Sequence, residues 1–172
     1  MTEHRSPWHA SYGPGVPPTV EVPDEGVPAS LARAARSWPD RVAVDFLGGT
    51  TTYRELASAV ARAARVLVDL GVQRGDRIAI ALPNGTAHVV AFHAALRIGA
   101  VVVEHNPTYT ARELAHQLAD SGAVVAIVWE KAVAAVLSVQ AETAVRTVLA
   151  VDLSADLPLR SRLALRLPVP AA

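Results

Sequence analysis

The central part of the chain alternates between amphipathic stretches with helical spacing and short apolar runs rich in β-branched residues. Each amphipathic stretch ends at a glycine, a residue that readily takes the left-handed conformation found just beyond many helices. This order of helix, glycine and strand occurs three times in about eighty residues. The predicted helices run from 53 to Gly71, from 86 to Gly99 and from 111 to Gly122, and the predicted strands cover 77–82, 101–104 and 124–128.

Short, continuous, β-branched strands are typical of a sheet that is covered on both faces. Strands that alternate with helices favour parallel pairing through right-handed crossovers. The sequence therefore predicts an α/β fold in three layers, in which helices flank a mostly parallel sheet. Weaker patterns add a helix at 131–138 and a strand near 148–151.

Two of the predicted helices begin with the same polar signature. Thr52 precedes Glu55 by three residues, and Thr110 precedes Glu113 by the same distance. In such a capping box each side chain accepts a hydrogen bond from the other residue's backbone N–H, which satisfies donors at the helix start. The loss of a cap of this kind costs about 1 kcal/mol.

Ahead of the first helix–strand unit, the pattern predicts a short helix at 30–38, capped by Ser30, and then a hairpin. Apolar residues alternate between 42 and 46, and Gly48-Gly49 turns the chain. The stretch from Gly48 to Thr52 also has the glycine and threonine content of a phosphate loop. No lysine follows it, which favours the hairpin turn.

The two ends of the chain differ from this periodic part. Residues 1–28 hold six of the twelve prolines and predict an extended arm, in which Trp8 and Tyr12 pin the segment to the globular body. A disordered tail is the alternative. Residues 153–172 form a connector rich in leucine and arginine. They predict either a basic amphipathic helix at a membrane surface or a linker whose leucines pack on a further part of the protein.

Composition narrows the classes of protein to which the chain can belong. Apolar residues make up 51% of the sequence, enough for a core, and the net charge is zero, which argues against a nucleic-acid partner. The absence of cysteine excludes disulfides and thiolate metal sites. No apolar run is long enough to span a membrane, and residues 1–30 lack the core of a signal peptide. We therefore expect a cytoplasmic protein.

Few residues suggest catalytic chemistry. His88 and His93 lie five apart on one predicted helix, which is not the spacing of a zinc pair, and Lys131 is the only lysine. The most polar cluster, 104–107 (EHNP), follows a strand at the edge where open α/β sheets bind ligands. It is either a ligand-facing loop or a turn made by Asn106 and Pro107. No acid–base set, nucleophile or dinucleotide fingerprint accompanies it.

Several motifs of the sequence resemble those of a known family. TTTYREL at 50–56 is similar to the first core motif of the acyl-adenylate-forming enzymes, and LRIGAVVVEHNP at 96–107 is similar to the second. NPTYTARELAHQLADSGA at 106–123 resembles the long-chain fatty acid–CoA ligases most, as do PWHASYGPGVP at 7–17 and DLPLRSRLALRLPVP at 156–170. The resemblance covers nearly the whole chain, and the order and spacing of the motifs make it specific.

The resemblance implies a division into the arm 1–28, the amino-terminal α/β subdomain of an AMP-binding domain at 29–152, and the connector 153–172. It also implies chemistry that uses ATP, Mg²⁺ and CoA in a full-length ligase, with a fatty acid as substrate. The family's Ser/Thr/Gly–Lys phosphate loop, its adenine- and ribose-binding segments and its lid lysine have no counterpart in this sequence. No catalytic, cofactor-binding or metal-binding residue can therefore be assigned.

The resemblance leaves three functional hypotheses open. The chain is an amino-terminal piece of a long-chain fatty acid–CoA ligase without activity of its own, half of a split ligase that needs a partner chain, or a non-catalytic α/β binding module. In the first two, the connector and one face of the sheet pack against the remainder of the enzyme. Without those contacts we expect weak stability or self-association, and at most a peripheral contact with the inner face of the membrane.

Overall fold

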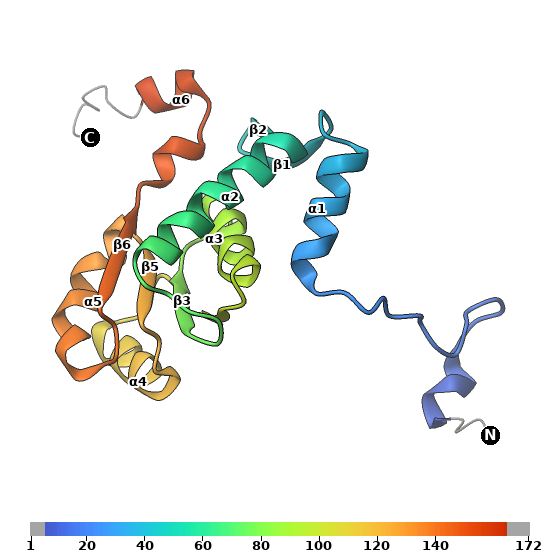
Figure 1. The fold of residues 1–172 in the computed structure, drawn as a ribbon, viewed down its shortest axis with the longest axis horizontal. Coiled ribbons are helices and arrows are strands. Elements are labelled where there is room, and N and C mark those ends of the chain that lie inside the picture. The colour runs from blue at the N-terminus through green and yellow to red at the C-terminus, as the bar shows by residue number, and fades with distance from the viewer. Residues whose placement is uncertain (1–5, 165–172) are drawn as a thin grey trace, which may run out of the picture.

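The computed structural model describes residues 6–164, and within them it contains the three predicted helix–strand units (Figure 1). Their bounds differ from the predicted ones by one or two residues. The units comprise α2 (Tyr53–Asp69) with β3 (Arg77–Ala81), α3 (Thr86–Arg97) with β4 (Val101–Glu104), and α4 (Ala111–Ser121) with β5 (Val125–Trp129). Gly71, Gly99 and Gly122 have φ values of 80°, 77° and 63°, as expected for glycines that follow helices.

Four strands form one parallel sheet in the order β4-β3-β5-β6, where β6 is Thr147–Val151. Strand β3 directs Ile78 and Ile80 to one face, where α2 and α3 cover them, and Ala79 and Ala81 to the other. On that second face, α4 and α5 (Val133–Val139) pack over the sheet through a cluster that includes Leu118. The predicted three-layer α/β fold is thus confirmed.

The connections between strands decide where the sheet opens. The chain runs from β3 through α3 to the neighbouring strand β4, and then returns through α4 on the opposite face to β5, on the other side of β3. The connections that leave β3 and β4 therefore diverge to opposite faces at the carboxyl ends of these strands. Open α/β sheets bind ligands at such a divergence.

The hairpin ahead of α2 forms a separate two-stranded antiparallel sheet of β1 (Val42–Phe46) and β2 (Gly49–Thr52). Its turn is one residue earlier than predicted. Leu47 and Gly48 have φ values of 52° and 81°, and Gly49 already belongs to β2. Two successive residues with positive φ are the requirement of the tight turn that matches strand twist.

The first helix, α1 (Val27–Ser37), begins earlier than predicted, and Ser30 is not its cap. Gly26 occupies the N-cap position and Pro28 lies in the first turn, where its missing N–H costs nothing. The Ser30 hydroxyl instead donates a hydrogen bond to the Val27 carbonyl, 2.7 Å away, within the helix. The predicted helix at 131–138 is a 3₁₀ turn (Glu130–Ala132) followed by α5.

The amino-terminal arm runs away from the globular body (Figure 1). It contains a 3₁₀ turn (Pro7–Ser11), and Trp8 remains 60% exposed. The prediction that Trp8 and Tyr12 pin the arm to the body is therefore wrong. These rings instead contact the His9 ring between them in sequence, with centroid distances of 6.1 Å and 5.4 Å. Prolines and glycines around them supply little apolar surface that could anchor the segment elsewhere.

After β6 the chain forms a 3₁₀ turn (Leu153–Asp156) and the short helix α6 (Leu159–Ala164). The predicted connector 153–172 continues to residues 165–172, which lie outside the described residues. Between residues 6 and 164, no helix combines the length and apolar character that crossing a bilayer requires.

Candidate functional site

The polar cluster predicted at 104–107 lies at the carboxyl end of β4, where a side chain from the start of α3 contacts it. The His88 Nε2 atom, in the first turn of α3, lies 3.1 Å from each carboxylate oxygen of Glu104. The spacing of His88 and His93 along the chain gives no sign of this pair, which was not predicted. The predicted parallel order of strands could have indicated this pair. In that order the helix after one strand begins beside the carboxyl end of the neighbouring strand, which places His88 near Glu104.

His105, the next residue, is buried, with 6% of its surface exposed. Its backbone N–H donates to the Ile80 carbonyl at 2.8 Å, which extends the pairing of β4 with β3. Its ring Nδ1 lies 2.7 Å from the Gln117 Oε1 of α4 and donates to it, so the ring links the sheet to that helix. Among the described residues, Nε2 has no hydrogen-bond partner. His105 therefore holds α4 in place at this end of the sheet.

Asn106 and Pro107 form a turn, the second of the two interpretations of the cluster. The Asn106 Oδ1 atom accepts hydrogen bonds from the Thr108 backbone N–H at 3.0 Å and from the Thr108 hydroxyl at 2.8 Å. Side chains of this type commonly organise turns in this way. The turn leads to the Thr110–Glu113 capping box, which forms as predicted at the start of α4, as does the box of Thr52 and Glu55 on α2.

The amino end of α3 is occupied by a carboxylate of the chain itself. The Ala87 backbone N–H donates to the Asp156 Oδ2 atom at 2.8 Å, and the same carboxylate lies 3.4 Å from the position that a Cβ of Gly85 would take. Free N–H groups at such a helix end commonly bind phosphate. Here a carboxylate from the 3₁₀ turn after β6 accepts a hydrogen bond from one of these N–H groups.

The other candidates have structural roles. The stretch from Gly48 to Thr52 is the hairpin turn and strand, as predicted, rather than a phosphate loop. The Lys131 ammonium lies 4.9 Å from the centroid of the Trp129 ring, a cation–π contact. Within 6–164 no group of three or more histidines, aspartates and glutamates is arranged to hold a metal ion.

Comparison with known proteins decides the family. The sequence profile described as AMP-binding enzyme matches residues 31–165 of the chain. The chain belongs to the AMP-binding enzyme family. The match includes both similar motifs and the whole parallel sheet, so the resemblance that the sequence suggested is confirmed.

Relatives within the AMP-binding family act on different acids. The long-chain-fatty-acid–CoA ligase of Bacillus subtilis is 33% identical over 119 residues, which are 69% of this chain and 21% of the ligase. The 2-succinylbenzoate–CoA ligase of a Geobacillus strain is 42% identical over 101 residues, 59% of this chain and 20% of that protein. The structure of the N-terminal domain of FACL13 from Mycobacterium tuberculosis superposes with a TM-score of 0.66 at 27% identity, covering 80% of this chain and 35% of that one.

This chain spans about a fifth of the length of the curated relatives that it matches. Both fatty and aromatic acids occur in the names of these AMP-binding relatives. Full-length members of the family use ATP, Mg²⁺ and CoA.

Proposed function

We propose that the chain is the amino-terminal α/β part of a long-chain fatty acid–CoA ligase. In the complete reaction a carboxylate oxygen attacks the α-phosphorus of ATP and pyrophosphate leaves. The CoA sulfur then attacks the acyl carbon, and AMP leaves. The observation that carries the proposal is the match to the AMP-binding family over residues 31–165, combined with the similarity to a long-chain ligase over 69% of the chain.

Within that enzyme, the proposal divides the chain into the arm 1–28, the α/β subdomain 29–152 and the connector 153–172. The chain supplies scaffold, and its catalytic, cofactor-binding and metal-binding residues lie elsewhere in the enzyme. One observation supports this role: the Asp156 carboxylate accepts a hydrogen bond from a backbone N–H at the start of α3. The proposed location is the cytoplasm, with the connector as a peripheral contact with the membrane.

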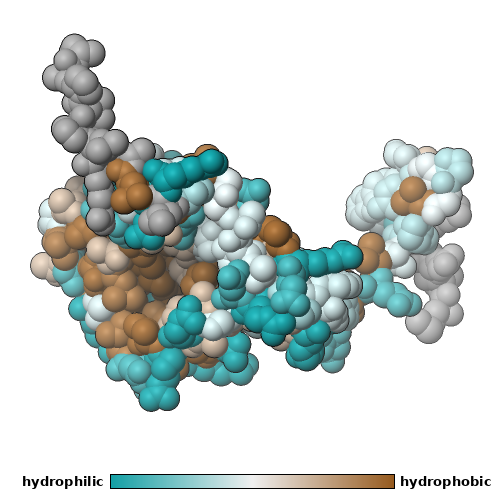
Figure 2. Space-filling view, turned by 90° about the horizontal axis from the view of Figure 1, so that it is seen from above, coloured by the Kyte–Doolittle hydropathy of each residue, from teal (hydrophilic) through white to brown (hydrophobic). Residues whose placement is uncertain are grey.

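One face of the sheet carries apolar side chains that are only partly covered, as expected if a further part of the enzyme packs on it. Strand β6 lies at the edge of the sheet, and its Leu149 and Val151 are only half-buried, as is Trp129 beside them on β5. Figure 2, seen from the side on which α6 lies, shows apolar side chains gathered in a hollow. Exposed apolar surface of this kind usually marks an interaction site. We propose that the remainder of the ligase covers it.

Fatty acid-dependent exchange of pyrophosphate into ATP tests the proposal. The purified chain alone is expected to show no exchange. Exchange is expected when it is co-expressed with a second chain that carries the rest of a long-chain ligase. Activity of the isolated chain would contradict the scaffold role, and failure of complementation would favour a non-catalytic binding module. In the active mixture, preference for benzoate or salicylate over a long-chain fatty acid would overturn the proposed substrate class.

A pair of matched variants tests the assembly surface. Val151→Asp places a charge on the half-buried face of β6 and is expected to abolish complementation. Leu137→Asp, on α5 at the opposite face of the sheet, where that side chain is 52% exposed, introduces a charge away from the proposed contact and is expected to leave complementation intact. Circular dichroism of both variants separates a loss of folding from a loss of assembly. Equal activity of the two mixtures would show that β6 is not the assembly surface.

A further inference from the structure

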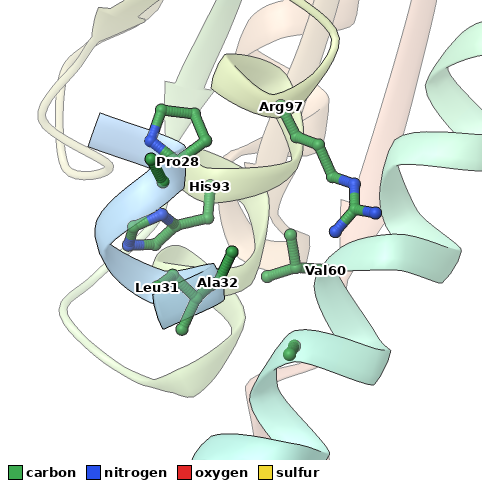
Figure 3. Close-up of a pocket in the computed structure, with 8 residues that line it drawn as sticks. Pro28, Leu31, Ala32, Val60, His93 and Arg97 are labelled. Carbon is green, nitrogen blue, oxygen red and sulfur yellow. The ribbon is translucent and has the colours of Figure 1, made fainter. Parts of the chain in front are cut away.

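A cavity of about 280 Å³ lies where α1 meets α2 and α3, away from the carboxyl ends of the strands (Figure 3). Most of its wall is apolar, and the two polar side chains in the wall come from α3. Its lining consists of Pro28, Ala29, Leu31 and Ala32 of α1, Ala57 and Val60 of α2, and His93 and Arg97 of α3. The volume is slightly smaller than the about 300–1,000 Å³ of pockets for drug-sized ligands, so it suits a smaller molecule.

Arg97 brings an uncompensated positive charge to this cavity. The ion pairs of the described residues, of which there are four, do not include it. In Figure 3 its side chain extends from α3 toward Val60 on α2, so the guanidinium lies beside an apolar wall. A guanidinium presents parallel N–H donors that match the two oxygens of a carboxylate. The cavity therefore combines an anion-binding group with apolar surface.

His93, one helical turn before Arg97, contributes a second polar group. Its Nδ1 atom is buried and has no hydrogen-bond partner among the described residues. Buried polar atoms normally have a partner, which leaves this one to be explained. Burial lowers the pKa of the His93 imidazole, so the ring is neutral at neutral pH and can donate one N–H without adding positive charge.

The packing of α1 supports an occupant between the helices. α1 has no buried residue, although it contacts both α2 and α3, and Leu31 is only partly buried against their core. A helix that contributes no buried side chain gains little from its packing. A molecule in the cavity would bury apolar surface on all three helices and hold α1 against the other two.

We propose that this cavity binds a small amphipathic monocarboxylate, with the carboxylate on Arg97 and a short aliphatic or aromatic body between Leu31 and Val60. A fully apolar ligand would leave Arg97 without a partner, whereas a small inorganic anion would leave the apolar wall unfilled.

Titration of the full chain with octanoate, followed by NMR, tests the proposal. We expect saturable shifts of the Leu31 and Val60 methyl signals. Arg97→Gln is expected to raise the dissociation constant about fivefold, the size of a partly exposed ion pair. Arg112→Gln, on the exposed side of α4, is the matched control and is expected to leave the constant unchanged. Octan-1-ol, which lacks the carboxylate, is expected to bind wild type and Arg97→Gln equally.

A filling variant gives the second arm of the test. Ala32→Phe places a ring in the cavity and is expected to abolish binding of octanoate and octan-1-ol alike. Several outcomes would overturn the proposal: no saturable shift at Leu31 or Val60, the same octanoate constant for Arg97→Gln and wild type, or unchanged binding by a folded Ala32→Phe protein. None of these readouts depends on ligase activity, so the outcome is separate from that of the proposed function.

Discussion

Replacement of Gly49 by alanine tests how the segment after β6 is held to the rest of the fold. A Cβ built on Gly49 would lie 2.5 Å from the Asp156 carbonyl oxygen and 3.3 Å from the Phe46 carbonyl oxygen. Both atoms belong to the backbone and cannot rotate away as a side chain can. The φ of Gly49 is not positive, so alanine is not strained there by its own conformation. Any effect of Gly49→Ala therefore reports the contact with the Asp156 turn.

The expected magnitude follows from two opposing effects. Forcing an extra methyl into a packed site costs about 1–3 kcal/mol. Alanine also lowers the conformational entropy of the unfolded chain, which stabilises the folded protein by about 0.4–1 kcal/mol and offsets part of that cost. At the middle of both ranges the net loss is about 1.3 kcal/mol, concentrated in the turn at 153–156. Because the Asp156 carboxylate also accepts the Ala87 N–H, displacement of this turn should release the first turn of α3.

Amide hydrogen exchange followed by NMR measures this effect locally. At about 1.4 kcal/mol per factor of ten, the Ala87 N–H of Gly49→Ala is expected to exchange about tenfold faster. Asp156→Ala should have a similar effect at Ala87, and Asp156→Asn, which keeps an acceptor, should restore much of the protection. Gly13→Ala is the matched control, because no atom lies within 4 Å of the added Cβ. Unchanged exchange at Ala87 in Gly49→Ala would refute the docking of this turn on the hairpin.

Two further substitutions and the unchanged chain have defined outcomes. Thr110→Val removes the cap of α4 and should cost about 1 kcal/mol in urea unfolding. The Thr110 backbone N–H, and then its hydroxyl, lower the pKa of Glu113 from its ordinary 4.5. This stabilisation is complete above that value and is lost as pH falls through the lower folded pKa. Thr110→Val removes the hydroxyl and keeps the backbone N–H, so it should flatten the acid limb in part and leave the larger contribution in place. Leu118→Ala, at 1% exposure, should cost about 2–5 kcal/mol. Because β6 leaves apolar surface half-buried, the isolated chain should self-associate in sedimentation velocity; a monomeric, cooperative unfolding transition would contradict this.

Local signals in the sequence determined most of the elements. The Thr52 and Thr110 capping boxes placed the starts of two helices to the residue, because their hydrogen bonds join groups only three positions apart. Glycines placed the helix ends for a similar reason, since the left-handed conformation is a property of a single residue. The start of α1 was missed because Ser30 can form its hydrogen bond inside a helix as well as at its cap.

The candidate site depended far more on tertiary structure. Glu104 was identified from its place after a strand, but its contact with His88 spans sixteen residues and exists only because α3 begins beside the end of β4. The capping of α3 by Asp156 spans sixty-nine residues, and neither partner carries a sequence signal for it. Such contacts arise when packing of the two sheet faces fixes the positions of distant segments.

By itself, the sequence determined the helices, the strands, their parallel pairing and the family. Hydrophobic periodicity, helix caps and family motifs each depend on residues that are close together along the chain. Only the tertiary structure decided that the arm runs away from the body, that the Asp156 carboxylate accepts an N–H at the start of α3, and that a cavity lies where α1 meets α2 and α3. These features depend on which apolar surfaces of the helices and the sheet pack against another element and which stay uncovered. That outcome is set by packing in three dimensions, which no local pattern encodes.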